Sequence, residues 1–301
     1  MTSHTNGHPQ SIEVRVLRQD APGAKTYWER HRVAYERDMN VISVLQRIAA
    51  QAKSAEGKAV APVAWDCNCL EEVCGACTML VNGRTRQACT ALVDKLLEDN
   101  PGEIELRPMS KFPVVRDLVV DRRRLFRALE KVKAWVPVDG YYDKGPGGRL
   151  SQDEQGQAYP LSECMSCGCC LEACPQYTKV ELTRRGGEAG GGETGGGETG
   201  GGETGGGESD EDFRRRETAA FDAAFIGAHA ISQTMLFNAN PTGKMNAGER
   251  LDALTAEGGI QVCGNAQNCV AVCPKSIPLT TSIARAGRAA TVHSIKKWFD
   301  R

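Results

Sequence analysis

The residues of this chain best suited to chemistry are its 13 cysteines, which fall into three dense groups along 301 residues. The groups span Cys67 to Cys89, Cys164 to Cys174, and Cys263 to Cys273. An odd number of closely spaced cysteines is a poor set for disulfides, whereas thiolates at short spacing are typical metal ligands. The sequence therefore predicts that these groups bind metal.

The first group has the spacing of a loop that wraps two irons. Cys69, Cys74 and Cys77 form a C-x4-C-x2-C run, and Cys89 follows after eleven residues. Plant-type ferredoxins hold a 2Fe-2S cluster with this spacing. Gly75 lies between two of the cysteines, where a bulky side chain would crowd the sulfides. We predict that these four cysteines bind a 2Fe-2S cluster and that Cys67 is not a ligand.

The second group has the spacing of a bacterial ferredoxin run. Once Cys169 is set aside, it reads C-x2-C-x2-C-x3-C-P, with its cysteines at Cys164, Cys167, Cys170 and Cys174. In two-cluster ferredoxins the fourth cysteine of such a run binds the other cluster. Cys169 is adjacent to Cys170, and neighbouring residues rarely point into one cluster together. We therefore expect Cys169 to be a small buried side chain and not a ligand.

The third group repeats this run with one replacement, because Ala266 stands where a cysteine would be. Exchange of the last cysteines divides the two groups between two sites. A 4Fe-4S cluster is assigned Cys164, Cys167, Cys170 and Cys273, and the other site has Cys174, Cys263 and Cys269. Three thiolates can hold three irons and alanine cannot bind a fourth. The second site is therefore predicted to hold a 3Fe-4S cluster, with a water-bound fourth iron as the alternative.

The remaining side chains predict no substrate chemistry, and we assign no catalytic residue to this chain. It contains no nucleophile constellation, paired-carboxylate motif or dinucleotide fingerprint. The five histidines do not assemble into a site: His31 falls in an expected turn, His229 in a helical pattern suited to packing, and His293 in a final surface helix.

Residues 10–120 read as a small mixed sheet crossed by one helix. Strands are predicted at 12–16, 33–37, 78–81, 88–92 and 103–106 from alternating apolar residues, with a turn at Asn82-Gly83. Asn40 is a candidate helix cap before Val41, Val44, Leu45 and Ile48, which share one helical face.

Residues 121–301 read as a mainly helical domain, so the predicted class is α+β. Apolar residues at helical spacing predict one long helix through 221–235 and another over 279–298 after a proline. The tract 186–209 repeats Gly-Gly-Gly-Glu-Thr and has no apolar core residues, so we expect a disordered insertion in a surface loop.

Composition points to a globular chain without a general attraction to nucleic acid. Hydrophobic residues make up 41%, charged residues 25%, and the formal net charge is -1. The basic clusters 122–124 and 214–216 are expected to be solvated helix faces. No apolar stretch has the length of a membrane span, and the N-terminus lacks a secretory pattern, so we expect a cytosolic protein that docks onto a membrane partner.

Taken together, these groups make the chain resemble the iron–sulfur subunit of succinate dehydrogenase and fumarate reductase, the respiratory Complex II family. Beyond the cysteines, the resemblance rests on Phe112-Pro-Val-Val-Arg-Asp-Leu-Val-Val-Asp121, on Phe225-Ile-Gly-Ala, and on Asn268-Cys-Val-Ala-Val-Cys-Pro-Lys275. It covers the chain except for the Gly-Gly-Gly-Glu-Thr tract. The resemblance implies a β-grasp ferredoxin domain followed by a helical ferredoxin domain.

The resemblance also implies the partners and the direction of electron flow. A flavoprotein subunit with FAD would oxidise succinate, and electrons would pass through the 2Fe-2S, 4Fe-4S and 3Fe-4S clusters to quinone in a cytochrome b-type membrane anchor. The complex would lie on the cytoplasmic face of a bacterial inner membrane. Ubiquinone-reducing members have tryptophans after the cysteine matched by Cys174 and a histidine after that matched by Cys263, and this chain has neither. That difference favours menaquinone.

Two alternatives remain at this point. The same kind of subunit serves fumarate reductases and other quinone-linked flavin dehydrogenases, and sequence does not fix the net direction. A zinc-stabilised adaptor without electron transfer is the alternative from another class, although zinc sites usually combine two C-x2-C pairs and the first group has only one.

Overall fold

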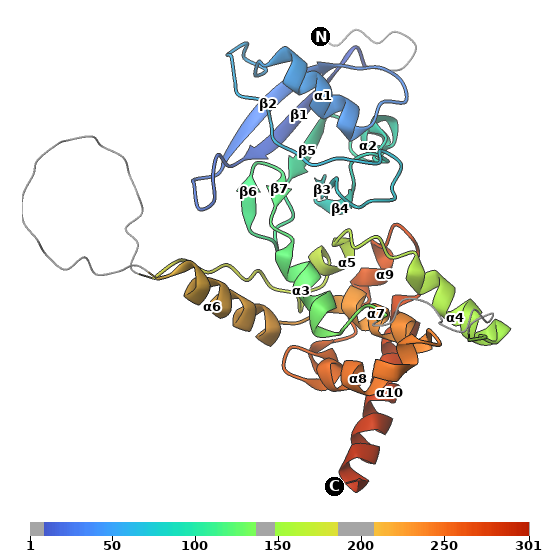
Figure 1. Cartoon of the computed structure of the whole chain (residues 1–301). Helices are drawn as coiled ribbons and strands as arrows, with labels where there is room; N and C mark the ends of the chain where they lie inside the picture. The colour runs from blue at the N-terminus through green and yellow to red at the C-terminus, as the bar shows by residue number, and fades with distance from the viewer. Residues whose placement is uncertain (1–8, 137–147, 186–207, 301) are drawn as a thin grey trace, which may run out of the picture.

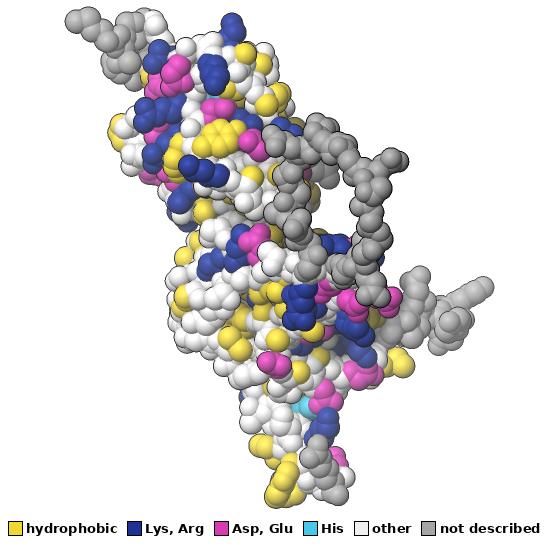
Figure 2. Space-filling model, turned by 90° about the vertical axis from the view of Figure 1, so that its left-hand side faces the viewer, with side chains coloured by type: hydrophobic (Ala, Val, Ile, Leu, Met, Phe, Trp, Pro, Cys, Tyr) yellow, Lys and Arg dark blue, Asp and Glu magenta, His cyan; other side chains and the backbone are white. Residues whose placement is uncertain are grey.

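The computed structural model describes residues 9–136, 148–185 and 208–300. A mixed sheet with two helices forms the N-terminal part, and a bundle of helices forms the C-terminal part below it (Figure 1). This arrangement confirms the predicted α+β class. The last helix extends beyond the bundle, away from the sheet, as the space-filling view also shows (Figure 2).

The N-terminal sheet has five strands in the order β2-β1-β5-β3-β4. β1 pairs in parallel with β5, and the other pairs are antiparallel. The strands are β1 (Ser11–Arg18), β2 (Tyr27–Ala34), β3 (Thr78–Val81), β4 (Arg84–Gln87) and β5 (Glu103–Arg107). The helices of this part are α1 (Val41–Gln51) and α2 (Val93–Asp99).

The alternating apolar residues of β1 and the N-terminal cap of α1 lie as predicted. Ile12, Val14 and Val16 of β1 are buried, with exposed fractions of 1% or less, and face the apolar side of α1. Asn40 caps α1, because its side-chain oxygen accepts a hydrogen bond from the backbone N–H of Ser43 at 2.9 Å. The predicted strand at 103–106 and the turn at Asn82-Gly83 are confirmed.

Two of the predicted strands lie at other residues in the structure. The strand expected at 88–92 is β4 at Arg84–Gln87, because the two-residue turn pairs Val81 with Arg84 and the partner strand must begin there. The second strand is Tyr27–Ala34 and ends before the predicted 37. His31 lies inside it and not in a turn, and its buried ring is 2.9 Å from the Glu29 carboxylate.

A short hairpin connects the two parts of the molecule. It consists of β6 (Val114–Arg116) and β7 (Val119–Val120). Asp117 at its turn is fully buried and accepts a hydrogen bond from Arg18 Nε at 2.8 Å, so the hairpin is held against the sheet. Further along, the buried Glu172 carboxylate accepts bonds from the backbone N–H groups of Ser110 and Lys111, at 2.9 and 3.1 Å.

The helical part is built around one central helix, α7 (Gly227–Ala239). It packs against α10 (Leu279–Phe299), α4 (Gln152–Ser162), α8 (Ala247–Thr255) and α3 (Arg123–Lys131). The core of this part contains Leu125, Ile226, Ile231, Leu254 and Ala286. Among the described residues, no helix is long and apolar enough to cross a membrane. The elements are α3 (Arg123–Lys131), α4 (Gln152–Ser162), α5 (Cys169–Glu172), α6 (Asp210–Ala223), α7 (Gly227–Ala239), η1 (Gly243–Asn246), α8 (Ala247–Thr255), η2 (Ile260–Val262), α9 (Asn268–Ala271) and α10 (Leu279–Phe299).

The long helix predicted through 221–235 is broken into α6 and α7. Ala224 is extended, and Gly227 has a φ of 85°. A Cβ at Gly227 would lie 2.1 Å from Leu171 Cδ2, so the chain turns where only glycine fits. The apolar periodicity continues across the break and therefore did not reveal it. The helix predicted over 279–298 is confirmed as α10.

Most of the tract predicted to be disordered, residues 186–207, lies outside the described residues. Its last two residues are placed, and the prediction was wrong for them. Ser209 caps α6 by accepting a bond from the Asp212 N–H, and Glu208 pairs with Arg216 at 2.7 Å. Arg185 and Glu208 also exchange two hydrogen bonds of 3.0 Å, so the chain leaves and returns at one point.

Candidate metal centres

The first cysteine group lies on the loop that leads into β3 and at the end of the β3–β4 hairpin. Cys77 and Cys89 are buried, with exposed fractions of 4% and 5%, whereas Cys69 and Cys74 are partly exposed. Cys67 is exposed. The four predicted ligands therefore come from one loop and the adjoining hairpin, as their spacing requires.

Backbone N–H groups converge on the two loop sulfurs. Cys69 Sγ accepts bonds from the N–H of Glu71 at 3.5 Å, and of Val73 and Cys74 at 3.3 Å. These bonds lower the pKa of the Cys69 thiol to about 7. Cys74 Sγ accepts bonds from the N–H of Cys69 and Ala76 at 3.5 and 3.4 Å. Such donors stabilise thiolates and a cluster with net negative charge.

Left-handed backbone conformations make this convergence possible. Leu70, Glu72 and Gly75 have φ values of 64°, 57° and 72°. Residues other than glycine adopt such values infrequently, and they concentrate at functional sites. Burial raises the pKa of the Cys77 thiol to about 12, so its thiolate needs a cation beside it. An iron cluster bound here would supply that cation, and the site fits a 2Fe-2S group.

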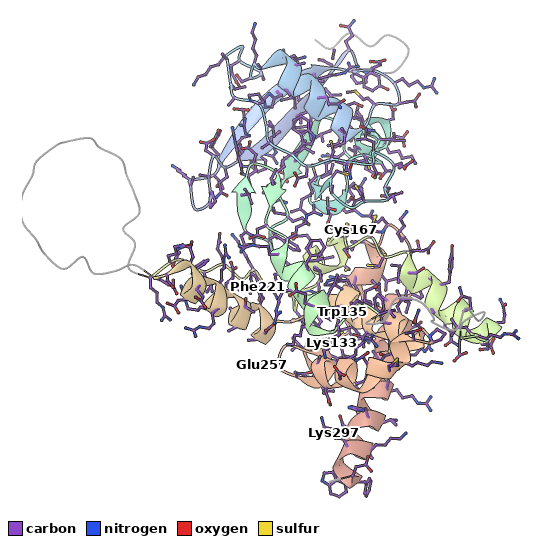
Figure 3. All side chains as sticks on the ribbon, viewed as in Figure 1. Lys133, Trp135, Cys167, Phe221, Glu257 and Lys297 are labelled. Carbon is purple, nitrogen blue, oxygen red and sulfur yellow. The ribbon has the colours of Figure 1, made fainter. Side chains whose placement is uncertain are left out.

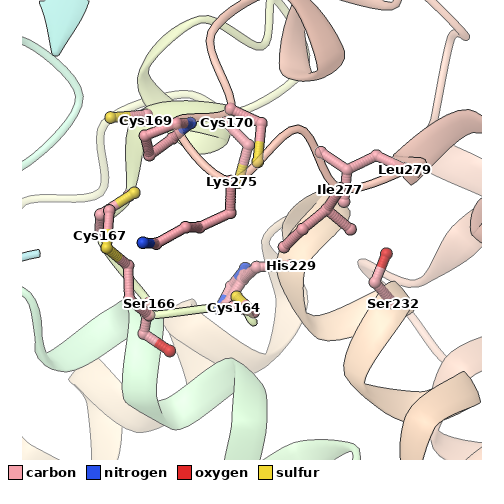
Figure 4. A pocket seen from close by; sticks show the side chains of 14 residues that line it. Cys164, Ser166, Cys167, Cys169, Cys170, His229, Ser232, Lys275, Ile277 and Leu279 are labelled. Carbon is pink, nitrogen blue, oxygen red and sulfur yellow. The ribbon is translucent and has the colours of Figure 1, made fainter. Parts of the chain in front are cut away.

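A second cavity contains the four cysteines that were assigned to the 4Fe-4S cluster. Figure 4 shows Cys164, Cys167 and Cys170 around it, together with His229 and Lys275. Cys273 also lines it, although it belongs to the third sequence group. Burial raises the pKa of the Cys164 and Cys170 thiols, which again favours thiolates only with a metal beside them.

A third cavity contains the other three cysteines. Cys263 and Cys269 line it, and so does Cys174, which comes from the second sequence group. Ala266 lies at the same wall and offers only a methyl group. The cavity therefore has three thiols and an apolar side chain at the fourth position, which fits a 3Fe-4S group.

The two cavities of the helical part are lined by the cysteines of the second and third predicted sets, with Cys174 and Cys273 exchanged, and Cys169 also lines the cavity that contains Cys273. The two runs are joined directly, since Asn268 Nδ2 donates to the carbonyl oxygen of Ala173 at 3.1 Å. Within the described ranges, no three His, Cys, Asp or Glu side chains meet closely enough to hold one metal ion. The sulfurs instead line cavities, and ligation of iron by these cysteines stays a prediction.

Arg122 joins the first site to the helical part, a contact that the sequence pattern does not reveal. Its Nη1 donates to the carbonyl oxygen of Gly75 and its Nη2 to that of Ala76, both at 2.7 Å. Arg124 is buried, donates to the Phe225 carbonyl at 3.0 Å, and stacks over Tyr177. The predicted solvated face was therefore wrong for both, because contacts with distant segments partly bury Arg122 and bury Arg124. Arg123 is exposed.

Gly75 lies at a close contact between the first and second sites. A Cβ at this position would lie 2.8 Å from both Cα and Cβ of Cys167. Figure 3 shows Cys167 at the junction between the sheet and the helices. A glycine is therefore required at position 75 because a side chain would clash with Cys167, whereas the sequence analysis had given crowding of the sulfides as the reason. The 2Fe-2S loop lies directly against a predicted ligand of the next site.

Two further residues at these sites are buried. Cys169 is fully buried, as expected, and its sulfur lies 3.5 Å from Nε2 of Gln87, the last residue of β4. His229 is packed in the core as expected. Its Nε2 donates to the carbonyl oxygen of Leu125 at 3.2 Å, and burial lowers the pKa of His229 to about 4.

Comparisons with known proteins agree with this geometry. Residues 13–127 match the 2Fe-2S iron–sulfur cluster binding domain family. The chain is 43% identical to the succinate dehydrogenase iron–sulfur subunit of Bacillus subtilis, over 96% of both chains. It is 29% identical to the fumarate reductase iron–sulfur subunit of Mycobacterium tuberculosis, over 76% of this chain and 75% of the relative.

The fold also has a counterpart among solved structures. A chain of the Mycobacterium smegmatis Sdh1 complex in the apo form superposes with a TM-score of 0.61. The match has 20% identity and covers 93% of this chain and 95% of that one, so it supports the fold. Together, the ferredoxin domain and the 43% identity over nearly the whole length place the chain in the family of succinate dehydrogenase iron–sulfur subunits, which are components of an oxidoreductase.

Proposed function

We propose that this chain is the electron-transfer subunit of a succinate dehydrogenase that reduces quinone. The observation that carries the proposal is the division of the cysteines among one loop and two neighbouring cavities, with Cys174 and Cys273 exchanged and Ala266 at the fourth position of the last cavity. Clusters bound at these places would supply one-electron chemistry without any substrate site on this chain.

The ligand sets follow from these positions. The 2Fe-2S cluster would be held by Cys69, Cys74, Cys77 and Cys89, the 4Fe-4S cluster by Cys164, Cys167, Cys170 and Cys273, and the 3Fe-4S cluster by Cys174, Cys263 and Cys269. Cys67 and Cys169 would not be ligands. The protein contributes N–H donors to sulfur, burial and fixed spacing, which are the features that set cluster potentials.

The spatial order of the three sites supports a series. The first loop touches Cys167 at Gly75, and the second and third cavities share the run that contains Cys164 to Cys174. The second site therefore lies between the other two. The flavoprotein subunit with FAD would lie at the 2Fe-2S side and the quinone-binding membrane anchor at the 3Fe-4S side.

The end of α10 supports docking onto a membrane partner. Trp298 and Phe299 are 69% and 73% exposed, and Lys296 and Lys297 lie beside them. Aromatic residues and lysine together are typical of membrane–water interfaces. The subunit would therefore be peripheral, on the cytoplasmic face of a bacterial inner membrane. Menaquinone is proposed as the quinone on a separate ground, the lack of tryptophans after Cys174 and of a histidine after Cys263.

The domain division is also a proposal. A boundary between 10–120 and 121–301 is supported by the end of β7 at Val120 and the start of α3 at Arg123. The contacts of Arg122 and Glu172 cross this boundary and would keep the two domains in one orientation.

A fumarate reductase subunit is the alternative function, and relatives with that name support it. The chain is 24% identical to the fumarate reductase iron–sulfur subunit of Wolinella succinogenes, over 91% of this chain and 94% of the relative. Succinate and fumarate turnover by the purified complex would separate the two. Turnover of neither acid would reject both.

Metal and sulfide analysis of the purified complex tests the proposal most directly. We expect about nine irons per chain of this subunit and three paramagnetic signals, one for each cluster. Stoichiometric zinc in a colourless protein would instead establish the adaptor alternative. Two signals, or loss of the 3Fe-4S signal from a fully loaded preparation, would contradict the ligand sets.

A further inference from the structure

Gln87 lies between the first and second sites. It is fully buried and is the last residue of β4, the strand that a two-residue turn joins to β3. Its Oε1 is 3.6 Å from the sulfur of Cys77, a predicted 2Fe-2S ligand. Its Nε2 is 3.5 Å from the sulfur of Cys169, which neighbours the 4Fe-4S ligand Cys170. One amide therefore connects the surroundings of both clusters.

The hydroxyl of Thr78 completes this buried polar group. It accepts a bond from Gln87 Nε2 at 2.8 Å and donates to the carbonyl oxygen of Gly75 at 2.8 Å. The same carbonyl oxygen also accepts the 2.7 Å bond from Arg122. Gly75 would thus keep a donor even if the Thr78 hydroxyl turned elsewhere.

Ligation changes what Cys77 can do in this group. A thiol can donate its hydrogen to Gln87 Oε1, but a cysteine bound to iron is a thiolate and has no hydrogen. If Gln87 Oε1 faced that thiolate, two hydrogen-bond acceptors would lie against each other in a buried place, which is unfavourable. The oxygen and nitrogen ends of an amide have nearly the same shape, so the same slot accepts the side chain turned by 180°.

The turned amide satisfies every neighbour. Its N–H would then face the Cys77 thiolate, and its oxygen would face the Thr78 hydroxyl and the Cys169 thiol, each of which can act as a donor. Thr78 can give up its bond to Gly75 because Arg122 remains bound there. A non-ligand cysteine at 169 thereby gains a role, since its S–H holds the amide oxygen on the far side from Cys77.

We propose that Gln87 is a tuning residue of the 2Fe-2S cluster: it donates N–H to the Cys77 thiolate, and the thiol of Cys169 orients it from the 4Fe-4S side. This inference rests on the proposed function for its clusters. A hydrogen bond to sulfur stabilises the reduced, more negative form, so it raises the midpoint potential of the cluster. Cys169 acts through Gln87 and is a positioning residue.

The test is a redox titration of the purified complex, in which the 2Fe-2S paramagnetic signal is followed. Gln87→Met keeps the length and volume of the side chain but removes the donor. We expect its 2Fe-2S midpoint to fall, by a roughly fivefold to tenfold shift in the redox equilibrium, or up to about 59 mV for one electron. Gln51→Met, at an exposed glutamine of the same domain, is the matched control and should not shift.

A pair of variants at Cys169 tests the orienting thiol. Cys169→Ala removes the donor to the amide oxygen and should lower the same midpoint by part of the Gln87→Met shift. Cys169→Ser retains a hydroxyl donor and should restore it towards the original value. This pair decides the matter even if Gln87→Met does not incorporate clusters, because equal midpoints in the two variants would overturn the proposal.

The remaining outcomes separate this inference from the proposed function. An unchanged midpoint in Gln87→Met, with full iron content, overturns the role of Gln87 and leaves the proposed function standing. A wild-type complex without any 2Fe-2S signal overturns the proposed function, and the role of Gln87 falls with it.

Discussion

Replacement of Gly75 by alanine tests how closely the two domains must approach at the first cluster loop. The added methyl group would lie 2.8 Å from Cα and Cβ of Cys167 and 3.0 Å from the carbonyl oxygen of Met165. Two of these atoms belong to the backbone and the third is fixed beside it. They cannot move aside as the tip of a long side chain could, so the loop or α5 has to shift.

The expected loss of folding stability in Gly75→Ala has two parts. The φ of 72° at Gly75 costs an alanine about 1 kcal/mol. Overpacking against a fixed neighbour adds about 2 kcal/mol. For a chain of 301 residues, the second part alone corresponds to roughly 3 °C in the midpoint of thermal unfolding.

Gly83→Ala is the matched control, because the two glycines share a backbone conformation but not a neighbourhood. Gly83 has a φ of 74°, and a Cβ there would meet only the end of Arg107, at 3.8 Å. Thermal unfolding of the cluster-loaded protein, followed by the loss of cluster absorbance, compares the two variants. We expect the midpoint temperature of Gly75→Ala to be lower than that of Gly83→Ala, by the shift that corresponds to overpacking. Equal midpoints would refute the close contact between the cluster loop and Cys167.

Four further outcomes are expected. Arg122→Met removes two bonds to the cluster loop, so hydrogen exchange around Cys74 should rise, whereas Arg123→Met at an exposed neighbour should not change it. Ala266→Cys should admit a fourth iron and abolish the oxidised 3Fe-4S signal, and a persistent signal would contradict the assignment. A hydrogen bond to Asp94 raises the pKa of Tyr35 to about 12 from 10.0. The stability from that bond is therefore full below pH 10 and is lost as the pH rises through 12. The titration of Tyr35 is measured as the difference in absorbance between the wild type and Tyr35→Phe as the pH rises. A phenol that titrates at pH 10 in this difference would contradict the prediction. Deletion of 187–207 should leave the iron content unchanged because Arg185 and Glu208 are bonded to each other, and loss of any cluster would speak against it.

The features that the sequence predicted well are those that short stretches of chain determine. Three cysteines within nine residues must meet on one loop, so the set around Cys69 to Cys77 follows from spacing alone. The same is true of β1, α1 and α10, whose periodicity places one face against the core. The exchange of Cys174 and Cys273 was predictable because it is built into the run itself.

The features that the sequence did not predict depend on contacts between distant segments. Arg122 reads as part of a charged helix start, and only the docking of the cluster loop gives its guanidinium two carbonyl partners. Gln87 reads as a polar residue of a strand, yet it is fully buried because α5 covers it. The break before α7 arises from the position of Leu171, which is far away in the sequence.

The exchanged cysteines also bear on the order in which the protein matures as it leaves the ribosome. All four cysteines of the first site have been made at residue 89, and the sheet is complete once β5, which joins β1 to β3, has been made, so that domain can fold while the helical part is still in synthesis. Neither cavity of the helical domain has all its sulfurs until Cys263, Cys269 and Cys273 have emerged, close to the C-terminus. On the proposed ligand sets, a chain that ends between the N-terminal domain and Cys263 would lose both helical-domain centres at once and would keep only the 2Fe-2S cluster.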